Sequence, residues 1–225
     1  RSFGNYDLAA SLADIVDNSI TAGATNVSIS CDYGKGDSQI IIADNGKGMS
    51  KEGLIVAMRF ASRNPTDERT ENDLGRFGLG LKTASFSQGR RLTVITSNGL
   101  KLSGARWDYD QSDNWEMELL APKEIAEISV LTERKSGTEV IWNKLDRLSE
   151  GGSIDESIWN EKLTEAEREL GLIFHRYISG KETARKPLKL EMNGIAIPPF
   201  DPFEENNPAT IKYPTETLLL KESEI

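Results

Sequence analysis

Two polar side chains, four residues apart, are the first in this chain that could do chemistry together. Asp14 and Asn18 lie in a stretch whose apolar residues recur at helical spacing, so both are expected on one side of a helix, roughly opposite its apolar stripe. An Asn oxygen suits Mg²⁺, which binds oxygen ligands and usually shares them with phosphates and water. A carboxylate one turn earlier can orient and deprotonate an attacking water. Taken alone, the pair is also typical of a solvated helix face.

A third polar group, Asp44, directly follows the apolar run 39–43 and begins the sequence DNGKGM. A carboxylate only accepts hydrogen bonds, so it pairs with the exocyclic amino group of adenine and repels the carbonyl oxygen of guanine. Glycine at position 48, next to Met49, lets a base ring approach the backbone closely. The same residues also fit a turn that simply ends a strand.

A glycine-rich run, GRFGLGLK, occupies residues 75–82. A turn that enters a helix presents unpaired N–H groups and the positive end of the helix dipole, which suits a triphosphate. The run has no Gly-Lys-Ser/Thr sequence and no βαβ context, so it is neither a P-loop nor a dinucleotide fingerprint. Between residues 59 and 91 seven Lys or Arg face four Asp or Glu, which concentrates positive charge here. The predicted phosphate-binding residues are Gly75, Gly78, Leu79, Gly80 and Lys82.

Thr138 follows Gly137 at the start of a strand-like run that ends at Trp142. Its hydroxyl can hydrogen-bond an adenine edge directly or through water. A β-branched residue after a glycine is also a common way to begin a strand.

These residues need a scaffold, and the apolar periodicity predicts one. The expected order is helix, hairpin, short helix, polar loop, helix, antiparallel meander, helix and hairpin. Helices gathered on one face of a mixed, mostly antiparallel sheet form an α+β two-layer sandwich. The expected helices cover residues 7–22, 50–60, 79–87 and 159–178, the strands 27–31, 39–43, 92–97, 101–107, 115–120 and 138–142, the polar loop 62–74 and the last hairpin 186–197.

The composition excludes several classes of protein. A chain of 225 residues with 37% hydrophobic content can bury a core. It has no apolar run of roughly 20 residues and no leading signal segment, so we expect a cytoplasmic protein with no membrane partner. A net charge of −9 argues against a surface broadly built for nucleic acid. The single cysteine, Cys31, is expected to fill the core.

In this order and spacing, residues 5–145 resemble the four motifs of the gyrase, heat-shock chaperone, histidine kinase and MutL (GHKL) superfamily, which shares the Bergerat ATP-binding fold. ADIVDNSITAGAT, DNGKGM, GRFGLGLK and GTEVIWN carry the resemblance. It implies binding of ATP and Mg²⁺, with Asn18 on the metal, Asp14 as general base, and Asp44, Gly48, Met49 and Thr138 around adenine. The loop 62–74 falls where the superfamily keeps its ATP lid.

The resemblance also implies an activity and partners. We expect ATP hydrolysis to ADP and phosphate, slow because Asp14 is one methylene shorter than the usual Glu, and lid closure coupled to homodimerisation. Residues 1–180 would form the ATP-binding domain and 181–225 the truncated start of a transducer domain, with DNA binding possible through regions not present. Within the superfamily, GRFGLGLKTAS is most similar to the MORC ATPases and their bacterial relatives, and second most similar to the heat-shock chaperones. MutL and gyrase look more distant.

Two other functions fit the same motifs. The first is a nucleotide-gated module that binds DNA or protein and hydrolyses little. The second is a histidine protein kinase, although the sole histidine, His175, follows the ATPase region, whereas sensor kinases resemble one another in carrying a phosphoacceptor helix before it.

Overall fold

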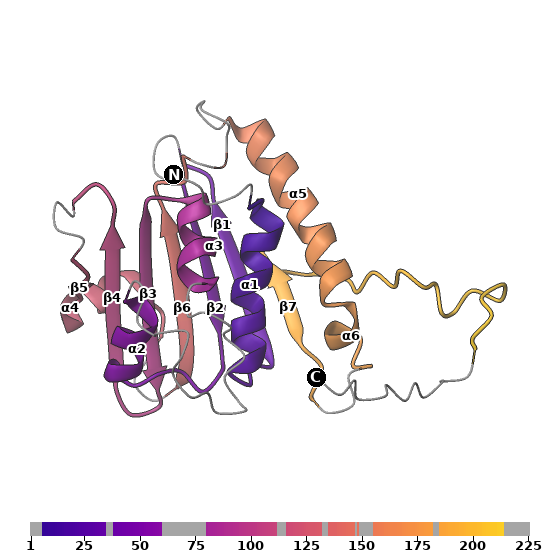
Figure 1. The fold of residues 1–225 in the computed structure, drawn as a ribbon, viewed down its shortest axis with the longest axis horizontal. Helices are drawn as coiled ribbons and strands as arrows, with labels where there is room; N and C mark the ends of the chain where they lie inside the picture. The colour runs from indigo at the N-terminus through magenta and orange to yellow at the C-terminus, as the bar shows by residue number, and fades with distance from the viewer. Residues whose placement is uncertain are drawn as a thin grey trace, which may run out of the picture.

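The computed structural model in Figure 1 shows one twisted sheet with helices against it. The predicted polar loop 62–74, and with it Gly75, Gly78 and Leu79, lies outside the described residues. The structure describes residues 6–34, 38–59, 80–111, 116–131, 135–146, 148, 155–181 and 185–213.

Within these ranges the sheet has eight strands in the order β5-β4-β3-β6-β2-β1-β7-β8. Neighbouring strands are antiparallel except for the parallel pair of β1 and β7. The predicted α+β sandwich with a mostly antiparallel sheet is therefore confirmed. The strands are β1 (Asn26–Asp32), β2 (Gln39–Asp44), β3 (Arg91–Asn98), β4 (Leu102–Asp108), β5 (Glu118–Leu119), β6 (Ser136–Asn143), β7 (Lys189–Met192) and β8 (Ile195–Ala196).

Three helices, α1 (Leu8–Thr21), α3 (Gly80–Gln88) and α5 (Glu156–Ile173), lie side by side over one face of the sheet (Figure 1). The shorter α2 (Lys51–Met58) packs near β4, and α6 (His175–Ile178) follows α5 after a break at Phe174. Their bounds differ from the predicted ones mainly at this break, which divides the helix expected over 159–178.

A helix that the sequence pattern did not predict, α4 (Pro122–Ile128), covers part of the opposite face. Its Ile125 packs in a small cluster with Ile95 of β3 and Ile141 of β6. The residues that precede these two in their strands, Val94 and Val140, belong to the main core instead. Because successive side chains of a strand point to opposite faces, α4 lies across the sheet from α1.

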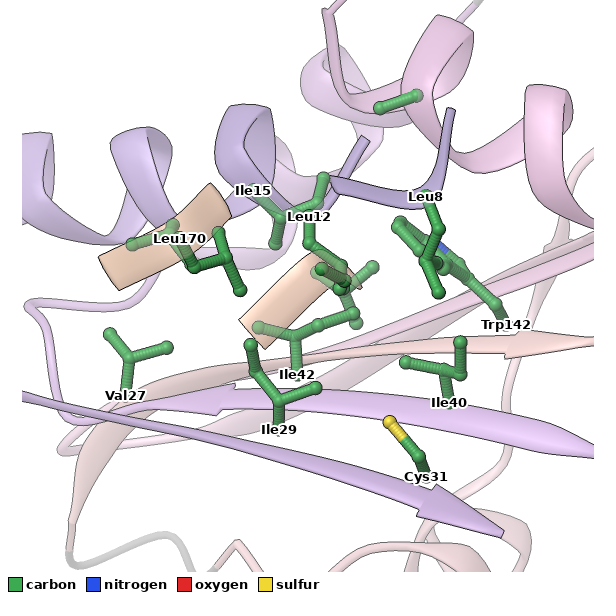
Figure 2. Packing of buried hydrophobic residues seen from close by; sticks show 14 of the residues in the cluster. Leu8, Leu12, Ile15, Val27, Ile29, Cys31, Ile40, Ile42, Trp142 and Leu170 are labelled. Atoms are coloured by element: carbon green, nitrogen blue, oxygen red, sulfur yellow. The ribbon is translucent and has the colours of Figure 1, made fainter. Parts of the chain in front are cut away.

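The main core lies between α1 and the central strands, as Figure 2 shows. Leu12 and Val16 of α1 are fully buried, and Ile29 and Ile42 of the sheet are about 1% exposed. Full burial of one such side chain contributes roughly 1.5–3 kcal/mol. Cys31 is buried in this core as predicted, and burial raises the pKa of its thiol to about 12, which makes the thiolate scarce.

The ends of α1 follow their local sequence. Asp7 caps the helix, since its Oδ1 accepts a hydrogen bond of 2.7 Å from the Ala10 N–H. Gly23, with φ of +79°, ends it. In the part of the chain that the structure describes, no helix is long and apolar enough to cross a membrane.

Gly48 gives a prediction about stability. It has φ of +62°, and a Cβ there would lie 1.8 Å from the carbonyl oxygen of Ser97. Gly99, with φ of +82° and nothing within 4 Å of such a Cβ, is a matched control for the backbone strain alone. We expect Gly99→Ala to cost about 1–2 kcal/mol and Gly48→Ala more than about 3 kcal/mol in urea unfolding. Equal losses would contradict the close backbone contact.

Candidate functional site

The carboxylate of Asp14 lies at the start of helix α3. It is half-buried on α1, and its Oδ2 accepts a hydrogen bond of 3.0 Å from the Tyr6 hydroxyl. A Cβ built on Gly80, the first residue of α3, would lie 4.0 Å from the same oxygen. The structure therefore brings two separately predicted parts, the acidic residue and the end of the glycine-rich run, to one place.

Asn18 follows Asp14 by one turn of α1 and is exposed. Residues four apart on a helix lie one above the other, so its side chain shares a side with Asp14. The apolar residues between them are buried toward the sheet.

Asp44 ends β2, and both its carboxylate oxygens are held. Oδ1 accepts from the Gly46 N–H at 2.8 Å, and Oδ2 accepts from the Ser19 hydroxyl at 3.0 Å. Burial raises the pKa of Asp44, and hydrogen bonds from the backbone of Gly46, the Ser19 hydroxyl and the backbone of Thr138 partly oppose that rise. The carboxylate is thus fixed in orientation at the end of its strand.

Thr138 lies directly opposite Asp44 in the β2–β6 pairing, and opposite Thr96 in the β3–β6 pairing. Thr96, fully buried, was not predicted as part of the site. Its hydroxyl donates to the Gly137 carbonyl at 3.1 Å, accepts from the Met49 N–H at 2.9 Å, and lies 3.2 Å from the Thr138 hydroxyl. Either hydroxyl can be the donor in this last contact, and in both cases the Thr138 oxygen keeps a lone pair that can accept another hydrogen bond.

Glycines near Asp44 allow close backbone crossings. A Cβ on Gly46 would lie 2.9 Å from that of Ala22, and one on Gly137 would lie 2.3 Å from the Asp44 carbonyl oxygen. With the contact of Gly48 at Ser97, these crossings explain the glycines without a ligand.

Asn45, the second residue of DNGKGM, has a structural role that the motif alone does not predict. Its Oδ1 accepts from the N–H groups of Thr25 and Asn26, each at 2.9 Å. Asn45 thereby ties the turn after β2 to the start of β1.

Lys82, a predicted phosphate ligand, is buried against the end of α2. It is 1% exposed, and its Nζ donates to the carbonyls of Ala57 at 2.9 Å and Arg59 at 2.6 Å. Between them, the Met58 carbonyl accepts from Trp107 Nε1 at 2.8 Å. Three consecutive carbonyls at the end of α2 are satisfied in this way, and burial lowers the pKa of Lys82. A phosphate contact by Lys82 stays a prediction, and these bonds give its burial a structural reason.

His175 begins α6, where its Nδ1 lies 2.7 Å from the Leu172 carbonyl oxygen. Its ring also lies near Phe203, with ring centroids 6.4 Å apart. Both contacts are of a kind that packs a histidine into a helix end.

The carbonyls at the end of α2 lead to a prediction. Lys82→Met should lower the free energy of unfolding by about 1–3 kcal/mol, because it leaves two carbonyls without their donor. Trp107→Phe removes the donor to the third carbonyl. The loss of unfolding free energy in the double variant should differ from the sum of the two single losses, because the carbonyls are consecutive. Lys101→Met is the control, because Lys101 is exposed, and it should change the free energy of unfolding by less than about 0.5 kcal/mol. Chemical denaturation of the two single variants, the double variant and the control measures these free energies. An unchanged free energy of unfolding in Lys82→Met would show that its two hydrogen bonds contribute nothing.

Comparison with known proteins adds evidence independent of this geometry. The family model described as "Histidine kinase-, DNA gyrase B-, and HSP90-like ATPase" matches residues 6–138. A DNA mismatch repair protein MutL of Halobacterium salinarum is 32% identical over 108 residues, covering 47% of this chain and 16% of that protein. The chaperone protein HtpG of Rickettsia canadensis is 33% identical over 103 residues, covering 41% of this chain and 16% of that protein. The chain thus spans about a sixth of the length of these relatives.

Solved structures support the fold. The ATPase and transducer domains of DNA topoisomerase II from Balamuthia mandrillaris align with a TM-score of 0.52 at 17% identity, over 85% of this chain and 48% of that one. The ATPase region of topoisomerase II from Saccharomyces cerevisiae aligns with the same TM-score at 15% identity, over 84% and 48%. MutL, expected to be more distant, is among the matches, and the similarity to MORC ATPases stays a prediction.

Proposed function

This chain belongs to the family of histidine kinase-, DNA gyrase B- and HSP90-like ATPases, and from that premise we propose that it binds ATP with Mg²⁺, hydrolyses it slowly and acts as a nucleotide-driven switch. ATP binding and switching are general to the family. The residues, the slow rate and the partners are proposals for this chain.

The observation that carries the proposal is the pair of acceptors at Asp44 and Thr138. The two side chains lie on facing strands and point to the same face of the sheet as the main core. A carboxylate and a hydroxyl oxygen, both accepting, match the exocyclic amino group of adenine and oppose the carbonyl oxygen of guanine. Gly48 and Met49 form the neighbouring backbone, and the Met49 N–H is held by Thr96.

The triphosphate is assigned to the start of α3. This helix has nine residues, so its first N–H groups and the positive end of its dipole favour an anion at Gly80. Gly75, Gly78, Leu79 and Lys82 complete the proposed phosphate site.

A magnesium ion fits Asn18 when the phosphates share its coordination. In the described ranges there is no group of three or more His, Cys, Asp or Glu that could hold a metal ion. Asn18 is exposed one turn from Asp14, which suits an ion held mainly by phosphates and water. When bound, the ion would neutralise phosphate charge.

Asp14 is the proposed general base. It takes a proton from water as the water oxygen attacks the γ-phosphorus and the bond to the bridging oxygen breaks, releasing ADP and phosphate. The side chain is one methylene shorter than Glu, and a misplacement of about 1 Å can cost about 10²-fold in rate. Slow turnover is therefore expected.

A switch requires contacts that differ between nucleotide states, and the γ-phosphate supplies them. We propose that closure of residues 62–74 over ATP is coupled to homodimerisation, and that residues 181–225 begin a transducer-like segment. Cytoplasmic location and DNA contacts through other regions belong to the same proposal.

The short side chain of Asp14 also favours the second candidate, a nucleotide-gated module that binds DNA or protein with little hydrolysis. A histidine kinase is less well supported, because the sole histidine of this sequence, His175, follows the ATPase region.

The adenine site is tested by Asp44→Asn. The protein should stay folded but bind a non-hydrolysable ATP analogue with Mg²⁺ at least ~30-fold more weakly, a loss of about 2 kcal/mol. Recognition of adenine needs the charged carboxylate, and burial raises the pKa of Asp44. The carboxylate of the wild type should therefore become protonated, and its affinity for the analogue should fall, at a pH above the ordinary range for Asp. Calorimetric titration between pH 5 and 8 measures both. Unchanged affinity in a folded variant would remove Asp44 from the site.

Asp14→Ala tests hydrolysis. Phosphate release should fall at least ~10²-fold, while affinity for the ATP analogue stays within about two-fold. Asp17→Ala is the control, since Asp17 is an exposed carboxylate on the same helix. Equal rates in wild type and Asp14→Ala would exclude Asp14 from the mechanism and favour the binding module.

A further inference from the structure

Tyr6, which neither the motifs nor the proposed mechanism use, touches the proposed catalytic carboxylate. Its hydroxyl donates to Asp14 Oδ2 at 3.0 Å across eight residues of sequence. The hydrogen bond raises the pKa of the Tyr6 phenol, and burial and the negative charge of Asp14 add to the rise. The phenol therefore stays protonated at neutral pH and remains a donor.

The backbone of Tyr6 is fixed by the end of α3. Gln88, only 2% exposed, donates through Nε2 to the Tyr6 carbonyl at 2.9 Å and to the Ser11 hydroxyl at 2.7 Å. The next residue, Asp7, caps α1. One buried amide thus joins the segment before α1, the first turn of α1 and the last residue of α3.

The hydrogen bond from Tyr6 can orient Asp14, which as a general base is one methylene shorter than Glu. An Asp side chain that is free to rotate offers its oxygens in several directions, whereas a hydroxyl on Oδ2 restricts the carboxylate to one. A bond from a hydroxyl to a charged carboxylate is among the stronger kinds. Because Oδ2 is also the oxygen nearest Gly80, the bond holds the carboxylate at the start of α3 and leaves Oδ1 to accept a proton.

We propose that Tyr6 is a positioning residue for the hydrolysis of ATP, holding the Asp14 carboxylate in the orientation that activates water. This inference rests on the proposed role of Asp14. Tyr6 acts through Asp14 and makes no contact of its own with the reacting atoms.

The kinetic test is Tyr6→Phe, which keeps the ring and removes the hydroxyl. We expect kcat for phosphate release to fall about ten-fold, within the ~10²-fold range for a misplaced group, while the Kd for the ATP analogue changes less than two-fold. Tyr213→Phe is the matched control, because Tyr213 is 85% exposed, and should leave both values unchanged. Combining Tyr6→Phe with Asp14→Ala should lower kcat no further than Asp14→Ala alone.

A second measurement tests the contact without nucleotide. The phenol carbons of the tyrosines are titrated by NMR, and the Tyr6 signal is identified by its absence in Tyr6→Phe. In Asp14→Ala the Tyr6 pKa should fall toward its ordinary value, because the carboxylate that raises it is gone. An unchanged Tyr6 pKa would overturn the proposal by showing that the two groups do not meet in solution.

The outcomes separate this inference from the proposed function. If Asp14→Ala abolishes turnover but Tyr6→Phe retains the wild-type kcat, Asp14 stands as the base and the positioning role of Tyr6 is overturned. If Asp14→Ala hydrolyses ATP at the wild-type rate, the catalytic assignment itself fails and Tyr6 loses its role with it. If Tyr6→Phe weakens binding as much as it slows turnover, Tyr6 has a structural role only.

Discussion

The register of three central strands is the constraint on which the proposed adenine site depends. Antiparallel pairing of β6 with β2 and β3 sets Asp44, Thr138 and Thr96 in one row across the sheet. A slip of one residue in β6 would turn Thr138 to the other face and bring Glu139 toward the row. Glu139 is buried beside the segment after α4, where it accepts from the Val130 N–H, and burial raises its pKa. The two faces of β6 therefore carry groups that cannot exchange places.

The second half of the proposed site depends on the packing of α1 against α3. A small, mostly buried polar cluster joins these helices, in which the hydroxyls of Ser11 and Ser87 lie 3.0 Å apart and Gln88 Nε2 lies 2.7 and 2.9 Å from them. Buried polar groups of this kind cost free energy unless each finds a partner, so a satisfied cluster fixes the spacing and rotation of its helices. The position of Asp14 relative to Gly80 follows from that spacing, and the apolar stripe of α1 then orients the whole pair on the sheet.

Local patterns could predict the elements but not the contacts between them. The period of Leu8, Leu12 and Ile15 and the alternation in β1 are local properties of the chain, and both elements form where predicted. Thr96 has no local signal, because a threonine in a buried strand is ordinary until its partners on β6 and at Met49 are known. The helix α4 was missed because its pattern is seven residues long and its single buried residue is Ile125. For Lys82, the sequence showed a cation beside glycines, but tertiary packing decides which acceptors it reaches.

The negative net charge of the chain limits what can attract a triphosphate in this protein. The chain carries a net charge of −9, so its average field repels ATP. Lys82, a proposed phosphate ligand, also donates to two carbonyls at the end of α2. The N–H groups at the start of α3 add an attraction equivalent to roughly half a positive charge. Backbone N–H groups act at short range, and only when they point toward the phosphate oxygen that accepts the hydrogen bond. Because the net charge of the chain is negative, ATP binding would rely on Mg²⁺ to offset charge, which joins the metal proposed at Asn18 to affinity as well as to catalysis.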